Sequence, residues 1–124
     1  HSGKLTYCNA GHPPPMLLRA GGGLEFLEEG GTLVGMGLGH TYAQGAVDVG
    51  DGDTLLVYTD GVTEMENQEG AQFSMEALEA LFQDSHSASP EQVLQIITGR
   101  LQAHADGRPP DDDISLVCVR FNKT

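Results

Sequence analysis

Basic residues are scarce in this chain of 124 residues. Six Lys and Arg stand against eighteen Asp and Glu, which gives a formal net charge of −12. A surface this acidic repels the phosphates of nucleic acids and anionic membrane faces, and it favours cationic partners, metal ions above all. An ordinary water-exposed surface can carry the same charge, so composition alone does not decide between a metal site and a solvated surface.

Cysteine and long apolar runs are scarce as well. Cys8 and Cys118 are isolated within strand-like surroundings, a pattern that favours buried, reduced thiols over a disulfide framework. No run approaches the roughly 18 apolar residues of a membrane span, and the first residues lack the order of a signal peptide. We therefore expect a cytoplasmic protein. Its hydrophobic content of 39% supports one modest core, in one domain or a piece of a longer one.

Alternating side chains and turn residues predict an antiparallel, β-rich fold with two helices. Strands are expected over residues 5–9, 16–19, 24–27, 40–48, 54–59 and 114–121. The first three should form a meander of hairpins, and the apolar run at 54–59 indicates burial on both faces. One helix is expected over Met75 to Phe82. A second should begin with Ser89 as its N-cap and Pro90 in its first turn.

Five glycines fall within residues 30–39, which predicts a mobile or tightly folded loop. Its context differs from that of the phosphate-binding glycine loops, because no strand and long helix flank it and no Gly-Lys-Ser/Thr is present. Nucleotide binding is therefore not expected at this loop.

Acidic residues mark the ends of two apolar strands. Asp60 closes the strand at 54–59, and Asp111 to Asp113 precede the strand at 114–121. If these strands are antiparallel neighbours, the two acidic sites converge at one rim, where a cation would offset their repulsion. Oxygen ligands without Cys or His favour Mg²⁺ or Mn²⁺ over Zn²⁺. The structural alternative is that Asp60 caps a short helix beginning near Val62 and that the Asp triplet is an exposed turn.

A longer series of motifs resembles a known family. The series comprises Ala10 to Pro15 (AGHPPP), Gly52 to Glu64 (GDTLLVYTDGVTE), Asn67, Gly70, Phe73, and Asp112 to Ser115 (DDIS). It resembles the C-terminal part of the bacterial SpoIIE/RsbU-type phosphatases, which are PPM (PP2C-like) metal-dependent serine/threonine phosphatases. The resemblance covers essentially the whole chain. It implies that residues 1–124 are the C-terminal portion of the phosphatase domain, without its N-terminal part.

The resemblance implies an α+β fold, part of a PP2C-like α-β-β-α sandwich with an antiparallel sheet and two helices. It also implies a centre of two Mn²⁺ or Mg²⁺ ions at one edge of the sheets. Asp60 corresponds to the metal-binding aspartate of the Thr/Ser-Asp-Gly motif, and Asp112 to that of the Asp-Asp/Asn motif. Gly61, Glu64 and Asp113 are expected beside these ligands rather than on the ions.

Two departures and one gap qualify this correspondence. Ser115 replaces a commoner Thr, and Ser74 stands where many relatives have Gly. No segment matches the acidic residue or the metal-bridging Asp-Gly pair that the family places in its N-terminal half. His12 follows a glycine but belongs to the AGHPPP hairpin, so a structural role is expected for it. Without the missing ligands, this chain alone should be inactive or nearly so.

For the complete domain, the resemblance implies hydrolysis of phosphoserine or phosphothreonine on a regulatory protein such as an anti-sigma-factor antagonist. The module would often follow a sensor domain. A half-sandwich would expose an apolar sheet face, so a homodimer is a further expectation. The alternative is a non-catalytic protein-binding module derived from a phosphatase, which docks a regulatory protein through its glycine-rich loop and the helix at 75–82.

Overall fold

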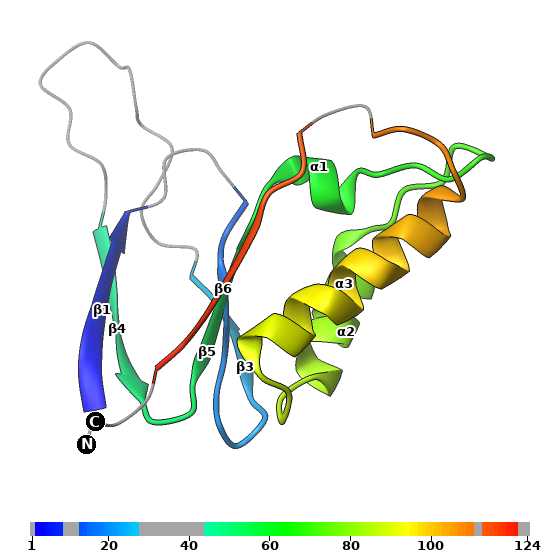
Figure 1. Ribbon diagram of the computed structural model, residues 1–124. Coiled ribbons are helices and arrows are strands. Elements are labelled where there is room, and N and C mark those ends of the chain that lie inside the picture. The colour runs from blue at the N-terminus through cyan, green and yellow to red at the C-terminus, as the bar shows by residue number, and fades with distance from the viewer. Residues whose placement is uncertain (1, 9–12, 28–43, 111–112, 122–124) are drawn as a thin grey trace, which may run out of the picture.

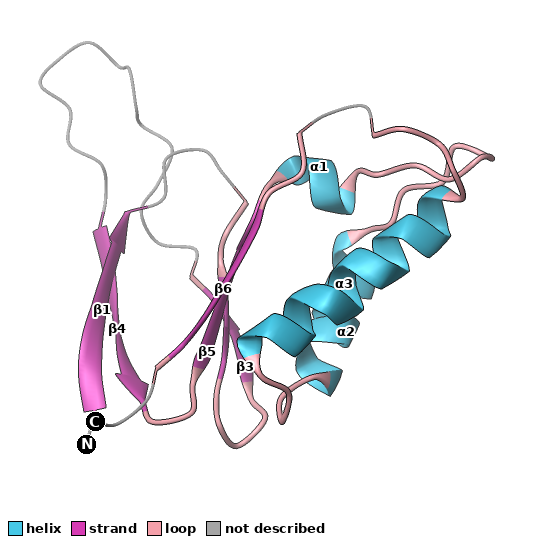
Figure 2. Cartoon of the chain, in the orientation of Figure 1, coloured by secondary structure: helices cyan, strands magenta, loops and turns pink. Residues whose placement is uncertain are grey.

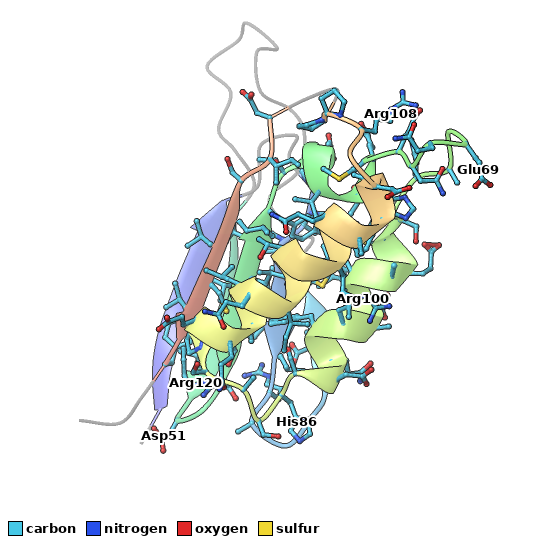
Figure 3. The ribbon with its side chains drawn as sticks, turned by 45° about the vertical axis from the view of Figure 1, so that its right-hand side comes forward. Asp51, Glu69, His86, Arg100, Arg108 and Arg120 are labelled. Carbon is cyan, nitrogen blue, oxygen red and sulfur yellow. The ribbon has the colours of Figure 1, made fainter. Side chains whose placement is uncertain are left out.

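The regular structure of this chain consists of two sheets and a layer of helices. The computed structural model describes residues 2–8, 13–27, 44–110 and 113–121. Their elements are, in chain order, β1 (Ser2–Cys8), β2 (Met16–Leu18), β3 (Leu24–Phe26), β4 (Gln44–Gly50), β5 (Thr54–Tyr58), α1 (Asp60–Thr63), α2 (Met75–Asp84), α3 (Pro90–Ala105) and β6 (Leu116–Arg120). Figures 1 and 2 show the smaller sheet on the left, the larger one in the middle and α2 and α3 on the right. Figure 3 shows the same helices in front of the larger sheet.

Both sheets are antiparallel. The larger has the order β3-β2-β5-β6, and the smaller is the pair β1-β4. The predicted hairpin of β2 and β3 is confirmed, but the predicted meander is wrong for its first strand, because β1 pairs with β4 with Ser2 opposite Gly50. Residues 13–15 are three prolines, which have no amide hydrogen to donate to a ladder, so β2 begins only at Met16.

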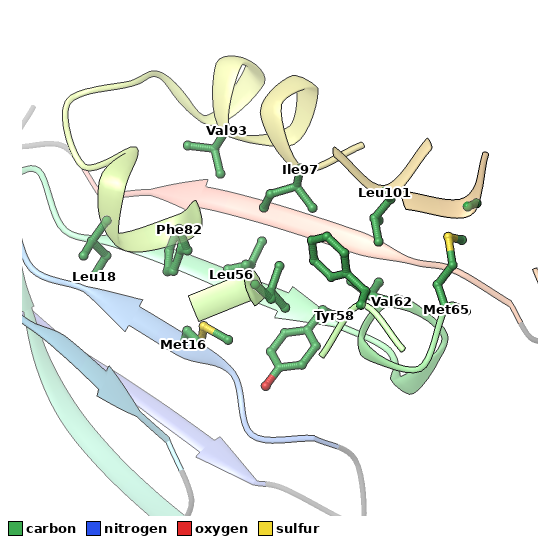
Figure 4. Close-up of a cluster of buried hydrophobic side chains, with 13 residues drawn as sticks. Met16, Leu18, Leu56, Tyr58, Val62, Met65, Phe82, Val93, Ile97 and Leu101 are labelled. Atoms are coloured by element: carbon green, nitrogen blue, oxygen red, sulfur yellow. The ribbon is translucent and has the colours of Figure 1, made fainter. Parts of the chain in front are cut away.

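The main core lies between α2, α3 and one face of the larger sheet (Figure 4). Leu56 and Tyr58 alternate along β5 and are at most 2% exposed. Val93, Ile97 and Leu101 repeat every four residues along α3 and form its buried stripe, as their spacing predicts. None of the helices in the described ranges is both long and apolar enough to cross a membrane.

The second face of the larger sheet is only partly covered. Leu55 packs with Leu17 and Val49 in a smaller core between the sheets. Further along, Val57 is 39% exposed, and its neighbours on β6, Val117 and Val119, are 53% and 40% exposed. The expected burial of residues 54–59 on both faces is therefore wrong at Val57, which does not belong to the smaller core that contains Leu55. We refer to these three valines as the valine strip.

Both long helices begin with a serine cap. The predicted N-cap Ser89 is confirmed: its hydroxyl accepts a hydrogen bond from the Gln92 amide at 3.2 Å in a complete capping box. Ser74 caps α2 with φ 88° and ψ 154°, a conformation found almost only at glycine. Glycine would adopt this backbone without strain, whereas Ser74 adopts it at a cost in strain.

Cys118 is a free, half-buried thiol on β6. Burial raises the pKa of Cys118, and the neighbouring Arg120 only partly opposes this effect. The raised pKa keeps the thiol protonated at neutral pH. It is half-buried rather than buried as expected, and its reduced state stays a prediction. The side chain of Cys8 lies outside the described part of the chain.

A buried carboxylate ties the turn after β2 to the turn before β5. Asp53 is 5% exposed, and its Oδ2 accepts hydrogen bonds from the Gly50 amide and the Arg19 guanidinium, each at 2.8 Å. Its Oδ1 accepts from the Ala20 amide at 2.9 Å. Burial alone would raise the pKa of Asp53, but these donors together outweigh it and hold the pKa below its ordinary value.

Replacing Asp53 by Asn should lower the free energy of unfolding at neutral pH by about 1–3 kcal/mol, because an amide nitrogen then faces buried donors. The depressed pKa means that this contribution is present above the unfolded pKa of about 4 and is lost as the pH falls through the lower folded value. In urea unfolding, the difference between wild type and Asp53→Asn should therefore shrink below about pH 4. The exposed Asp84→Asn is the control. A difference that stays constant down to acid pH would contradict the charged role of Asp53.

Candidate metal centre

The acidic segments that flank β5 and β6 lie at the same rim of the larger sheet. These strands are antiparallel neighbours with Tyr58 opposite Leu116, as the convergence of the two sites requires. Beyond the last pair, the Thr59 amide donates a hydrogen bond to the Ser115 carbonyl at 3.2 Å. Asp60, which follows β5, and Asp113, which precedes β6, are therefore brought to one end of the sheet, beside α1 in Figure 1.

The hydroxyl of Thr59 adds two bonds across this rim. It donates to the Asp113 carbonyl at 3.1 Å and accepts from the Ser115 amide at 3.0 Å. One side chain, directly before Asp60, thus fixes the backbone on both sides of Ile114. Sequence reasoning overlooked this role of Thr59; its position between the strand and the acidic residue was the available signal.

Asp60 is the first residue of α1, and its side chain is exposed. The N-cap position belongs to Thr59, whose side chain makes no capping bond. The structural alternative, in which Asp60 caps a helix beginning near Val62, is therefore wrong in its details. The Asp60 carbonyl accepts from the Glu64 amide at 2.9 Å and from the Thr63 hydroxyl at 3.4 Å, which fixes the backbone and leaves the carboxylate outside the helix.

The other predicted site residues differ in how they are placed. Gly61 is buried within α1, and Glu64 is exposed at its C-cap. Asp113 is exposed, and its carbonyl is held by Thr59. Asp112, the second predicted ligand, and His12 lie outside the described residues. The structure thus brings the segments of Asp60 and Asp113 together, while the predicted roles of all these side chains stay predictions.

The donor atoms at this rim are of the type that a hard divalent cation binds. They are carboxylate oxygens, which Mg²⁺ and Mn²⁺ accept. They do not suffice in number: across the described ranges, no three His, Cys, Asp or Glu side chains lie close enough together to hold a metal ion. An ion at this rim would take about six ligands, so Asp112, other residues and water would have to complete its shell.

Comparison with known proteins points to one family. A family model described as Stage II sporulation protein E (SpoIIE) matches residues 1–122. Protein IcfG of Synechocystis sp. is 34% identical to this chain over 121 residues, which make up 98% of this chain and 19% of IcfG. The chain therefore corresponds to about a fifth of this relative.

Solved structures share the fold. The structure of the RsbU and RsbW domains of Rv1364c from Mycobacterium tuberculosis aligns with a TM-score of 0.67 and 28% identity, over 98% of this chain and 33% of that one. The SiaA-PP2C domain of Pseudomonas aeruginosa aligns with a TM-score of 0.79 and 19% identity, over 96% of this chain and 47% of that one. The second likeness concerns the fold alone. The expected α+β fold of the PP2C-like type is confirmed, with the short helix α1 in addition to the two predicted helices.

Replacing Thr59 by Val keeps the branched shape and removes both hydroxyl bonds. We expect the free energy of unfolding to fall by about 0.5–1.5 kcal/mol, because water can reach this half-buried position and replace part of each bond. The Ser115 amide should exchange its hydrogen faster, as measured by NMR, whereas Thr59→Ser should preserve its protection. Equal exchange of Ser115 in wild type and Thr59→Val would show that the hydroxyl does not join the two segments.

Proposed function

This chain belongs to the SpoIIE family of PP2C-like phosphatases, and on that premise we propose that it is the C-terminal portion of a metal-dependent protein serine/threonine phosphatase domain. The observation that carries the proposal is the pairing of β5 with β6, which sets the segments of Asp60 and Asp113 at one rim. The chain spans 47% of the solved SiaA-PP2C domain, which supports a domain that extends beyond these residues.

The proposed reaction is hydrolysis of a phosphoserine or phosphothreonine ester on a protein. When bound, two Mn²⁺ or Mg²⁺ ions would lower the pKa of a water molecule and neutralise charge on the phosphate. Asp60 and Asp112 would hold these ions through their carboxylates. Thr59 would fix the separation of the segments that carry them, since its hydroxyl joins the backbone at Asp113 and Ser115. The exposed position of Asp60 leaves the rim open to a protein substrate.

Gly61, Glu64 and Asp113 would support the centre from beside it. Gly61 has no side chain and is buried in α1, so the backbone after Asp60 packs closely against its surroundings. Glu64 and Asp113 are exposed near the rim, where their carboxylates can orient water bound to the ions. The remaining ligands would come from the N-terminal part of the domain, so residues 1–124 alone would be inactive or nearly so.

The proposed setting is regulatory and cytoplasmic. The substrate would be a phosphorylated protein such as an anti-sigma-factor antagonist, and a sensor domain would precede the phosphatase domain. The occurrence of RsbU and RsbW domains together in Rv1364c supports such a setting. The valine strip is an apolar surface that a second subunit could cover, which supports a homodimer. The alternative function is a non-catalytic module that binds a regulatory protein through residues 30–39 and α2.

The test replaces each proposed ligand in the full-length protein. Asp60→Asn and Asp112→Asn should each reduce Mn²⁺-dependent hydrolysis of p-nitrophenyl phosphate by more than about 100-fold, since even residues that only contact a metal ligand are worth about 10–100-fold. The exposed Asp84→Asn is the matched control and should keep full activity. Residues 1–124 alone should show no Mn²⁺-dependent turnover. Activity that survives in both ligand variants, or a wild type that Mn²⁺ does not activate, would favour the binding module.

A further inference from the structure

A pocket lies between the second half of α3, Met65 and Ile114. Its volume is about 490 Å³, whereas an apolar cavity of about 150 Å³ is enough to hold a benzene ring. Met65, Leu101, Ala105 and Ile114 are among its apolar walls, and Figure 4 shows Leu101 of α3 next to Met65. Exposed residues of α3 line it as well, so solvent reaches it. The pocket is therefore large enough, and accessible enough, for one bulky apolar group from outside.

Hydrogen bonds connect two walls of this pocket to the backbone at Asp60. The Thr59 hydroxyl, directly before Asp60, bonds to the backbone on both sides of Ile114, at 3.1 and 3.0 Å. Met65 follows Glu64, whose amide donates to the Asp60 carbonyl at 2.9 Å. The pocket therefore lies next to the rim that carries Asp60, and it is reached from Asp60 along both directions of the chain.

The surroundings of the pocket are acidic. Residues 20–99 contain no Lys or Arg. Three exposed acidic residues are each next in the sequence to a residue of the pocket walls: Glu64, Asp106 and Asp113. Among the described residues that line the pocket, Arg108 is the one cation, and its Nη2 lies 3.2 Å from Glu66 Oε1. These charges favour basic side chains, and repel acidic ones, beside any group that enters the pocket.

We propose that this pocket binds an apolar side chain of the phosphorylated protein substrate, in the segment that carries the phosphoserine or phosphothreonine and beside basic residues of that segment. The inference rests on the proposed function and adds the choice of substrate to it. The phosphate is the same in every substrate, so discrimination between proteins depends on the residues around it. The simpler reading is a solvent-filled gap in the packing at the end of α3, which would discriminate between no substrates.

The experiment uses the full-length protein with Mn²⁺ and a set of phosphoserine peptides. In a background of Gly and Lys, one Leu is moved through successive positions on either side of the phosphoserine, and the reference peptides have Ala in its place. At one or two positions the wild type should show a kcat/KM at least about 10-fold higher for Leu than for Ala, the lower end of what one methylene group is worth in an apolar pocket. Replacing Lys by Glu in the best peptide should lower kcat/KM, and added salt should reduce that difference.

Tryptophan substitutions on α3 test whether the pocket causes this preference. Gln102 is exposed and lines the pocket, so Gln102→Trp should fill it and eliminate the preference for Leu over Ala. Thr98→Trp, one turn earlier on the same side, should act in the same direction. Gln95 is exposed on α3 but is not among the residues that line the pocket, so Gln95→Trp is the matched control and should keep the wild-type preference. A ratio of two peptides cancels any change in the metal centre that affects both alike.

The remaining outcomes would each overturn a different statement. Equal kcat/KM for Leu and Ala peptides in the wild type, or hydrolysis of p-nitrophenyl phosphate but of no peptide, would overturn the inference and leave the proposed function intact. A preference for Leu that persists in both Gln102→Trp and Thr98→Trp would also overturn it. A dimeric wild type that Gln102→Trp makes monomeric in sedimentation would assign the pocket to a second copy of the chain instead. Absence of Mn²⁺-dependent hydrolysis of every peptide and of p-nitrophenyl phosphate would overturn the proposed function, and the role of the pocket with it.

Discussion

The antiparallel pairing of β5 with β6 is the constraint on which the rest of this account depends. Because β5 and β6 run in opposite directions, the end of β5 and the start of β6 lie at the same edge of the sheet. An acidic segment follows the first and precedes the second. Thr59 extends the connection beyond the ladder through its backbone and its hydroxyl. The segments of Asp60 and Asp113 are thus held together by hydrogen bonds of the backbone and of the Thr59 hydroxyl.

Sequence patterns over a few neighbouring residues predicted the strands and the helix cap, which depend on those same residues. The strand at 54–59, the strand near the C-terminus and the cap at Ser89 follow from alternation, apolar runs and capping chemistry, and each is present within a few residues. The neighbour of β1 could not be predicted in this way, because pairing with β4 joins residues far apart in the chain. The exposure of Val57 was missed for a related reason: an apolar run shows that a face can be buried, and not what covers it.

The candidate site was likewise predictable only in part: its acidic residues were found, and the contacts that support them were not. Asp60 and the triplet at 111–113 stood out by their positions, and the structure brings the segments of Asp60 and Asp113 to one rim. The bonds of the Thr59 hydroxyl were missed, because its position before Asp60 was a signal too common to single it out. Its partners lie more than 50 residues away, so only the folded chain shows them.

The central claim is the proposal that Asp60 and Asp112 hold divalent cations together. The most direct measurement is an anomalous-difference map from crystals of the full-length protein grown with Mn²⁺. The account predicts manganese peaks at the rim beside α1, with carboxylate oxygens of both Asp60 and Asp112 at bonding distance from the ions. Manganese bound elsewhere, or side chains of Asp60 and Asp112 that point to separate regions of the folded domain, would contradict it.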